Sequence, residues 1–340
     1  MRGELIVRKY LGLLSISFLF LGTGMLTTYA EESGGYTIEG VPNSHQLDSN
    51  VGYFYLHEEV AGEDSVKVKL INTATKEKTL EVRVTNANTN TNGLIDYTGS
   101  LKDHSLLKYP LTSIAKPKQK KINVPAKSTV ETDIEIKMPN KPLLGVIVGG
   151  ITVSEKQEEG ENQKKLSLTN TYNYTLGLVL TNANKVELNK NVSVELENVK
   201  PILFDGKKIV QASILNPNPY VFPGATVKGE VLKESNQELV KKKQKQGVNI
   251  APYSVYPFQL DWEKDELKPG KYIFRGTVEA AGKTWKLEKD FEITSDKANA
   301  INRDSVYKVV IPQWCLYSVY GLLIFTVSGT IYLLLRKKEV

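Results

Sequence analysis

The chain has 340 residues, a formal net charge of +6 and one cysteine, Cys315. This length is sufficient for two domains that each bury a core. A single cysteine excludes an intramolecular disulfide and any site built from several thiolates. Residues 1–30 and 336–340 carry +2 each, which leaves about +2 for the rest of the chain. The central part is nearly neutral, and we expect no nucleic-acid partner.

The N-terminus has the features of a secretory signal. Basic residues precede an apolar stretch over 11–25, and small residues follow at Thr28 and Ala30. This arrangement predicts a signal peptide over 1–30, with the mature chain beginning at Glu31.

Residues 31–181 are predicted to form a β-sandwich domain. Residues 66–70 and 80–84 alternate apolar and charged side chains, as half-buried antiparallel strands do. Turn-forming pairs such as Asn92-Gly93 separate such segments. No long helical period interrupts the pattern.

A polar segment over 182–191, where the alternation lapses, is expected to join this domain to a second one. Residues 192–294 again contain β-branched and aromatic segments, with turns about every ten residues. This spacing favours a second sandwich of immunoglobulin-like type. Residues 295–313 are polar and are expected to form a short stalk.

Residues 314–335 carry no charge and would extend about 33 Å as a helix, enough to cross a hydrocarbon core of about 30 Å. Aromatic side chains lie at both ends, and residues 336–338 are basic. We predict a single membrane-spanning helix, with 336–340 in the cytoplasm and the bulk of the chain outside the cell. The predicted fold is all-β: two immunoglobulin-like sandwiches followed by one C-terminal transmembrane helix.

Catalytic motifs are missing from the sequence. His45, His57 and His104 lack metal-binding spacing, and no nucleophile elbow or phosphate-binding glycine loop occurs. We expect no catalysis, no metal site and no cofactor. A cell-wall hydrolase whose two carboxylates converge only in the fold is the alternative, and a purely structural stalk is another.

An asparagine-rich stretch in the first domain is the candidate peptidoglycan contact. Amides match the hydroxyl and N-acetyl groups of sugars, and aromatic rings stack on the apolar face of a sugar ring. The candidate residues are Asn86, Asn88, Asn90, Asn92, Tyr97 and Tyr109. The alternative is a plain turn, because asparagine tolerates left-handed backbone.

Aromatic residues beside proline-containing loops of the second domain are the candidate partner contact, because aromatic anchors dominate protein interfaces. They are Tyr220, Phe222, Tyr253 and Tyr256. Packing of these rings in the core at strand ends is the alternative.

Short motifs in a fixed order run through both predicted domains. Those of the first are Tyr53–Leu56, Leu70–Thr73, Asp96-Tyr97, Leu107–Pro110 and Gly145–Ile151. Those of the second are Gln211–Pro217, Ala251–Ser254, Asp261-Trp262 and Leu267–Tyr272. Together with the membrane segment and its basic tail, they resemble the WxL-interacting proteins of Gram-positive bacteria.

This resemblance implies a peptidoglycan-binding first domain and a second domain associated with binding to the host or its extracellular matrix. It also implies complexes with secreted WxL-domain surface proteins. We therefore expect a non-catalytic scaffold or adhesion protein in the cell membrane, with its domains at the cell wall.

Overall fold

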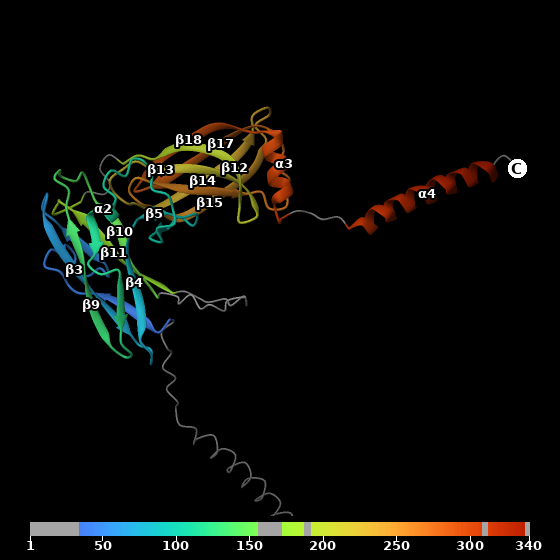
Figure 1. The fold of residues 1–340 in the computed structure, drawn as a ribbon. Helices are drawn as coiled ribbons and strands as arrows, with labels where there is room; N and C mark the ends of the chain where they lie inside the picture. The colour runs from blue at the N-terminus through green and yellow to red at the C-terminus, as the bar shows by residue number, and fades with distance from the viewer. Residues whose placement is uncertain (1–33, 156–171, 187–191, 308–311, 337–340) are drawn as a thin grey trace, which may run out of the picture.

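The computed structural model describes residues 34–155, 172–186, 192–307 and 312–336. The predicted signal peptide and much of the predicted 182–191 linker lie outside these ranges. Within them the chain is mostly β-strand, gathered into two bodies that are followed by the helix α4 (Figure 1).

The first domain, as we define it here, contains the strands β1 to β11 and the short helix α2 (Leu111–Ile114). One sheet has the order β1-β3-β9-β7 and the other β2-β11-β10-β4-β8. The strands are β1 (Tyr36–Gly40), β2 (Phe54–His57), β3 (Glu63–Asn72), β4 (Lys78–Asn86), β5 (Asn88–Thr89), β6 (Ile95–Asp96), β7 (Ala115–Pro117), β8 (Lys121–Val124), β9 (Thr129–Lys137), β10 (Ile147–Glu155) and β11 (Asn173–Thr181).

Alternation of side chains builds the core between these two sheets. On β3, Val66, Val68 and Leu70 are buried while the lysines between them are not. They belong to one cluster with Val82 of β4 and Ile151 of β10, which lie in the opposite sheet. Burial of alternate residues from both sheets is the arrangement of a β-sandwich.

The second domain, as we define it here, contains the strands β12 to β18 and the helix α3 (Ser295–Asp304). A sheet of order β12-β13-β16 faces a sheet of order β15-β14-β17-β18 across one core. The strands are β12 (Glu195–Phe204), β13 (Lys207–Asn216), β14 (Phe222–Lys233), β15 (Leu239–Ile250), β16 (Ser254–Asp261), β17 (Gly270–Ala280) and β18 (Lys283–Ile293).

Helix α3 corrects the expectation of a stalk that begins at residue 295. The side chain of Thr294 accepts a hydrogen bond from the Lys297 amide and caps the helix. Ala298 and Ile301 are buried in the second core, three residues apart and therefore on one helix face. Most polar residues of 295–304 lie on the solvent-facing side of this helix, which is why the sequence of the segment is polar.

In each domain a buried asparagine at a strand end donates to three backbone carbonyls. The Asn72 amide donates to the carbonyls of Lys76, Val124 and Pro125, at 2.8, 3.0 and 3.0 Å. The Asn216 amide donates in the same way to three carbonyls, those of Tyr220, Ile250 and Ala251. These bonds supply partners to backbone groups that the sheets leave unpaired.

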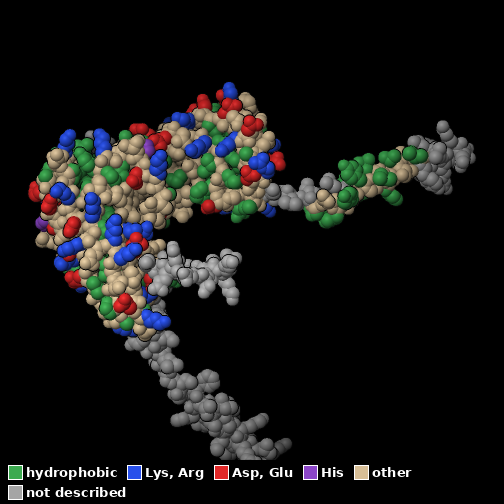
Figure 2. Space-filling view, in the orientation of Figure 1, with side chains coloured by type: hydrophobic (Ala, Val, Ile, Leu, Met, Phe, Trp, Pro, Cys, Tyr) green, Lys and Arg blue, Asp and Glu red, His purple; other side chains and the backbone are tan. Residues whose placement is uncertain are grey.

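The helix α4 (Gln313–Arg336) is long and apolar enough to cross a membrane. Hydrophobic side chains cover it, whereas charged side chains spread over both domains (Figure 2). The predicted fold class, two β-sandwiches followed by one C-terminal apolar helix, is confirmed.

Candidate binding surfaces

The asparagine-rich stretch forms a small hairpin of β5 and β6. At its tip, the Asn90 side-chain oxygen accepts hydrogen bonds from the amides of Asn92 and Leu94, at 2.9 and 3.2 Å. Gly93 has a φ of 73°, which favours glycine. In the described conformation Asn90 therefore organises the turn.

This hairpin contacts the second domain. The Thr89 hydroxyl accepts a hydrogen bond from the Ala251 amide at 3.0 Å and lies 3.0 Å from the Ser254 hydroxyl. The backbone N–H of Asn249 donates to the Gly93 carbonyl at 2.8 Å. A Cβ on Gly93 would lie 2.9 Å from Val248 Cγ2, so glycine also permits the close approach. The hairpin is thus part of the joint between the domains.

The other predicted peptidoglycan contacts lie in different surroundings. Asn86 and Asn88 are buried, and their amides donate to Asp103 at 2.6 and 2.9 Å. Asn92 is exposed, and Tyr97 is partly buried, which raises the pKa of its hydroxyl. Tyr109, also partly buried, packs on the first core. The six residues do not form one open surface, and a glycan contact by any of them stays a prediction.

A hollow of about 580 Å³ lies beside the buried amides; we call it the junction hollow. On the rim, His104 Nε2 lies 2.9 Å from the Glu197 carboxylate of the second domain. The side chains of Leu101 and Lys102 are exposed. The hollow is lined by Asn88, Thr89, Leu101, Lys102, Asp103, His104, Ser105, Val255 and Pro257. It offers polar groups next to apolar surface, as carbohydrate sites do.

A second set of contacts holds the domains together near β10. The Val146 amide donates to the Pro219 carbonyl at 2.9 Å, and the Tyr220 hydroxyl donates to the Leu144 carbonyl at 2.8 Å. A Cβ on Gly145 would lie 2.2 Å from the Pro219 oxygen, so no side chain fits there. Tyr220, predicted as a partner contact, joins the two domains within the chain.

The other three aromatic residues of the predicted partner contact do not share a surface. Phe222 and Tyr256 are 2% and 0% exposed and belong to the second core. Phe222 packs edge-on against Trp285, with ring centroids 5.3 Å apart. Tyr253 is partly buried in a turn with a φ of 52°. Phe222 and Tyr256 therefore pack in the core, as the alternative interpretation of these rings expects.

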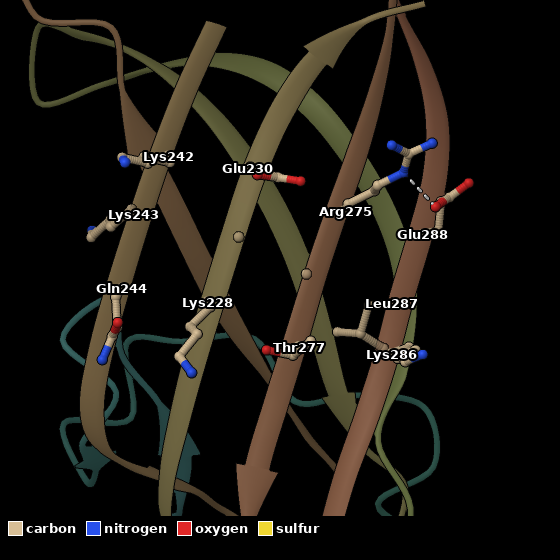
Figure 3. A pocket seen from close by; sticks show the side chains of 12 residues that line it. Lys228, Glu230, Lys242, Lys243, Gln244, Arg275, Thr277, Lys286, Leu287 and Glu288 are labelled. Carbon is tan, nitrogen blue, oxygen red and sulfur yellow. Dashed lines mark hydrogen bonds and ion pairs between the residues drawn. The ribbon is translucent and has the colours of Figure 1, made fainter. Parts of the chain in front are cut away.

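A larger hollow of about 750 Å³ crosses β15, β14, β17 and β18; we call it the charged hollow (Figure 3). Lys242, Glu230, Arg275 and Glu288 follow one another across the four strands, as the strand register requires. The lining residues are Lys228, Gly229, Glu230, Lys242, Lys243, Gln244, Arg275, Gly276, Thr277, Lys286, Leu287 and Glu288. This surface was not predicted, because its residues come from four strands and only the lysines of β15 stand together in the sequence.

Ion pairs neutralise part of the charged hollow. Arg275 Nε lies 2.7 Å from Glu288, and Lys228 Nζ lies 2.8 Å from Glu279. Lys243 Nζ donates to the Gln259 carbonyl at 2.8 Å, and burial lowers the pKa of this lysine. Basic side chains outnumber acidic ones in the lining, so the hollow suits an acidic ligand surface.

One carboxylate pair bears on the hydrolase alternative. The carboxyl groups of Glu58 and Asp64 are within hydrogen-bonding contact, with oxygens less than 4.8 Å apart, and the side chain of Glu58 is 3% exposed. Glycosidases hold their carboxyl groups about 5 Å or more apart around the scissile bond. This pair is too close and too deeply buried for that reaction.

Two family models match successive parts of the chain. The model described as "WxL Interacting Protein, peptidoglycan binding domain" matches residues 36–155, and "WxL Interacting Protein, host binding domain" matches residues 163–303. The second match begins ahead of β11, although β11 is hydrogen bonded within the first domain, between β10 and β2. No curated protein matches the chain.

Solved structures that match the chain include two chaperones and a chaperone-adhesion subunit complex. The E. coli chaperone DraB is 12% identical, with a TM-score of 0.31, and the match covers 76% of this chain and 96% of DraB. A chain of the CsuC-CsuE chaperone-tip adhesion subunit pre-assembly complex from Acinetobacter baumannii is 13% identical, with a TM-score of 0.33. That match covers 74% of this chain and 97% of the other. The YadV chaperone is 12% identical, with a TM-score of 0.30, and the match covers 76% of this chain and 100% of YadV.

Proposed function

Because the chain belongs to the WxL-interacting protein family, we propose that it is a membrane-anchored scaffold that binds peptidoglycan and docks WxL-domain surface proteins. The observation that carries this proposal is the order of the two family matches, the wall-binding model first and the host-binding model second. Both describe binding domains, which favours a protein without catalytic activity. We also propose host matrix proteins as ligands of the second domain.

The helix α4 supports a membrane anchor that keeps both domains at the cell surface. Its candidate span, Gln313–Ile331, follows the second domain closely in the sequence, since that domain ends with α3 at Asp304. A tether of this kind raises the effective concentration of each binding domain beside the wall, so weak contacts suffice for retention.

For the wall contact, we propose the junction hollow as the place where a glycan strand binds. Its supports are the size of the hollow, the apolar side chain of Leu101 and the hydroxyl and charged groups of Lys102, Asp103 and Ser105. The exposed Asn92 and partly exposed Tyr97 form the competing location, as the sequence suggested.

Sedimentation of the full chain with purified peptidoglycan sacculi, in detergent, tests the two locations. The double variant Leu101→Ala/Lys102→Ala is expected to weaken binding at least about tenfold, since it removes an apolar contact surface and a cationic hydrogen-bond donor. The matched control Leu106→Ala/Lys108→Ala changes exposed residues of the same loop outside the hollow. Loss of binding in Asn92→Ala/Tyr97→Ala alone would move the site to the hairpin.

For the partner contact, we propose the charged hollow of the second domain. Replacement of Lys242 and Lys286 by glutamate is expected to lower the affinity for a WxL-domain protein by about tenfold or more and to weaken its salt dependence. The control replaces Lys264 and Lys268 by glutamate; both lysines are exposed and lie outside the hollow. Equal loss in both double variants would indicate a general charge effect and contradict the assignment.

A further inference from the structure

Three side chains that bind metals in many proteins converge at one end of the first domain. His45 lies in the loop before β2, Glu58 directly follows β2, and Asp64 lies on β3. His45 Nδ1 is 3.2 Å from Asp64 Oδ2 and 3.4 Å from Glu58 Oε2. One donor atom from each residue lies within 4.8 Å of the other two.

These separations match those of ligands around one small cation. Zn²⁺ is bound by histidine nitrogen and carboxylate oxygen at about 2.0–2.2 Å, so two ligands of a tetrahedral site lie about 3.4 Å apart. The two distances from His45 Nδ1, 3.2 and 3.4 Å, agree with this value. The third pair, the oxygens of Glu58 and Asp64, lies within 4.8 Å, so convergence of the three side chains on one cation would fill three of four tetrahedral positions.

Glu58 supplies an independent reason to expect a cation. The residue is only 2% exposed, and the partners of its carboxylate are the His45 ring at 3.4 Å and a second carboxylate, Asp64. A buried carboxylate facing another carboxylate is costly unless positive charge or a proton compensates it.

Surrounding hydrogen bonds hold the three ligands in place. The Asn43 amide donates to Asp64 Oδ2 at 3.1 Å, and the Asn43 side-chain oxygen accepts from the His45 amide at 2.7 Å. The Asn182 amide donates to the Glu58 carbonyl at 2.6 Å. Bonds of this kind around the ligands orient the donor atoms of metal sites.

We propose that His45, Glu58 and Asp64 bind one divalent transition-metal cation of the Zn²⁺ type. Calcium takes six to eight oxygen ligands, whereas a histidine nitrogen with two carboxylates suits zinc and its neighbours. Because β2 and β3 belong to opposite sheets, the cation would link the two sheets of the first domain. It would serve as a cross-link in a chain whose single cysteine allows no disulfide.

The metal site departs from the expectation of no metal, which rested on the spacing of the histidines alone. Glu58 and Asp64 follow His45 by 13 and 19 residues, at intervals that match no short metal-binding motif. The sandwich brings them together because His45 pairs with the neighbouring strand: the His57 amide donates to the His45 carbonyl at 3.0 Å.

The test is Zn²⁺ titration of the tag-free full chain in detergent, after removal of metals with a chelator. Calorimetry should show saturable uptake of one Zn²⁺ per chain, and Zn²⁺ should raise the melting temperature of the first domain, whereas Ca²⁺ at the same concentration should not. His45→Ala and Asp64→Asn should each weaken uptake at least about tenfold.

The matched control is His104→Ala, which removes a histidine that faces one carboxylate, that of Glu197. It should bind Zn²⁺ as the unchanged chain does. If His45→Ala does not fold, Glu58→Gln takes its place, because it keeps the shape of the side chain. It should likewise weaken Zn²⁺ uptake. No saturable uptake by the unchanged chain, or uptake that the ligand variants leave unaltered, would overturn the proposal.

Discussion

At the scale of single residues, buried polar side chains determine how loops join the sheets. Asn72 and Asn216 occupy similar places, each at the end of a long strand, and each donates to three backbone carbonyls. Both are at most 1% exposed. An unpaired buried carbonyl costs about 1–3 kcal/mol, so these asparagines matter far more than surface amides do.

Asn216→Ala is therefore expected to lower the free energy of unfolding of the second domain by about 3 kcal/mol, because several buried groups lose their partner. Asn236→Ala, an exposed asparagine of the same domain, should change it by less than about 0.5 kcal/mol. Denaturant unfolding followed by tryptophan fluorescence measures both, since Trp262 and Trp285 lie in this domain. Equal effects would show that the buried amide is not important for stability.

Glu58 predicts a pH dependence of the metal-free chain. Its pKa is raised from 4.5 to about 7 in the folded state, so the folded chain holds the proton more tightly than the unfolded chain does. The stabilisation is complete below about pH 4.5 and is lost as the pH rises through about 7. In chelator, the melting temperature of the first domain should fall from pH 5.5 to pH 8. Glu58→Gln should flatten this decline, and an unchanged decline in that variant would assign it to other groups.

At the scale of elements, the hairpin of β5 and β6 and the helix α3 attach to the second domain by different means. In the hairpin, the Thr89 hydroxyl and the Gly93 carbonyl accept hydrogen bonds from the second domain. Helix α3 instead uses apolar contacts of Ala298 and Ile301. A polar joint depends on a few directional bonds, whereas an apolar one depends on buried area.

Thr89→Val should loosen the joint without unfolding either domain. The Ala251 amide loses its acceptor, so its hydrogen exchange should quicken about tenfold, equivalent to about 1.4 kcal/mol. Exchange measured by mass spectrometry over residues 249–254 reports this directly. Thr98→Val, an exposed threonine near the same hairpin, should leave that peptide unchanged, and a similar change there would contradict the assignment.

Ile301→Asp should destabilise the second domain by about 3 kcal/mol or more, because it places a charge in the core. Asn299→Asp, on the exposed side of α3, should have little effect on thermal unfolding. If both variants melt like the unchanged chain, α3 does not contribute to the fold of this domain.

At the scale of the whole molecule, two joined sandwiches and one apolar helix suit a surface scaffold. Removal of 313–340 should release the chain from membranes into the soluble fraction, because the apolar helix is gone. Removal of 337–340 alone should leave it membrane-bound. Fractionation with carbonate extraction distinguishes the two, and a soluble full chain would contradict the anchor.

The sequence by itself determined the strands and the apolar helix, because period-2 alternation and an uncharged run are local properties. Residues such as Val66, Val68 and Leu70 could be assigned to a core face from their spacing alone. The order of short motifs was also sufficient to identify the family, as both family models confirm.

Only the tertiary structure decided what the polar residues do. Thr89 bonds to Ala251, 162 residues away, so the asparagine-rich stretch could not be recognised as a joint from its composition. His45, Glu58 and Asp64 become neighbours only when two sheets pack face to face. Local patterns determine which face a residue occupies, whereas partners across the fold depend on long-range packing that no short window of sequence contains.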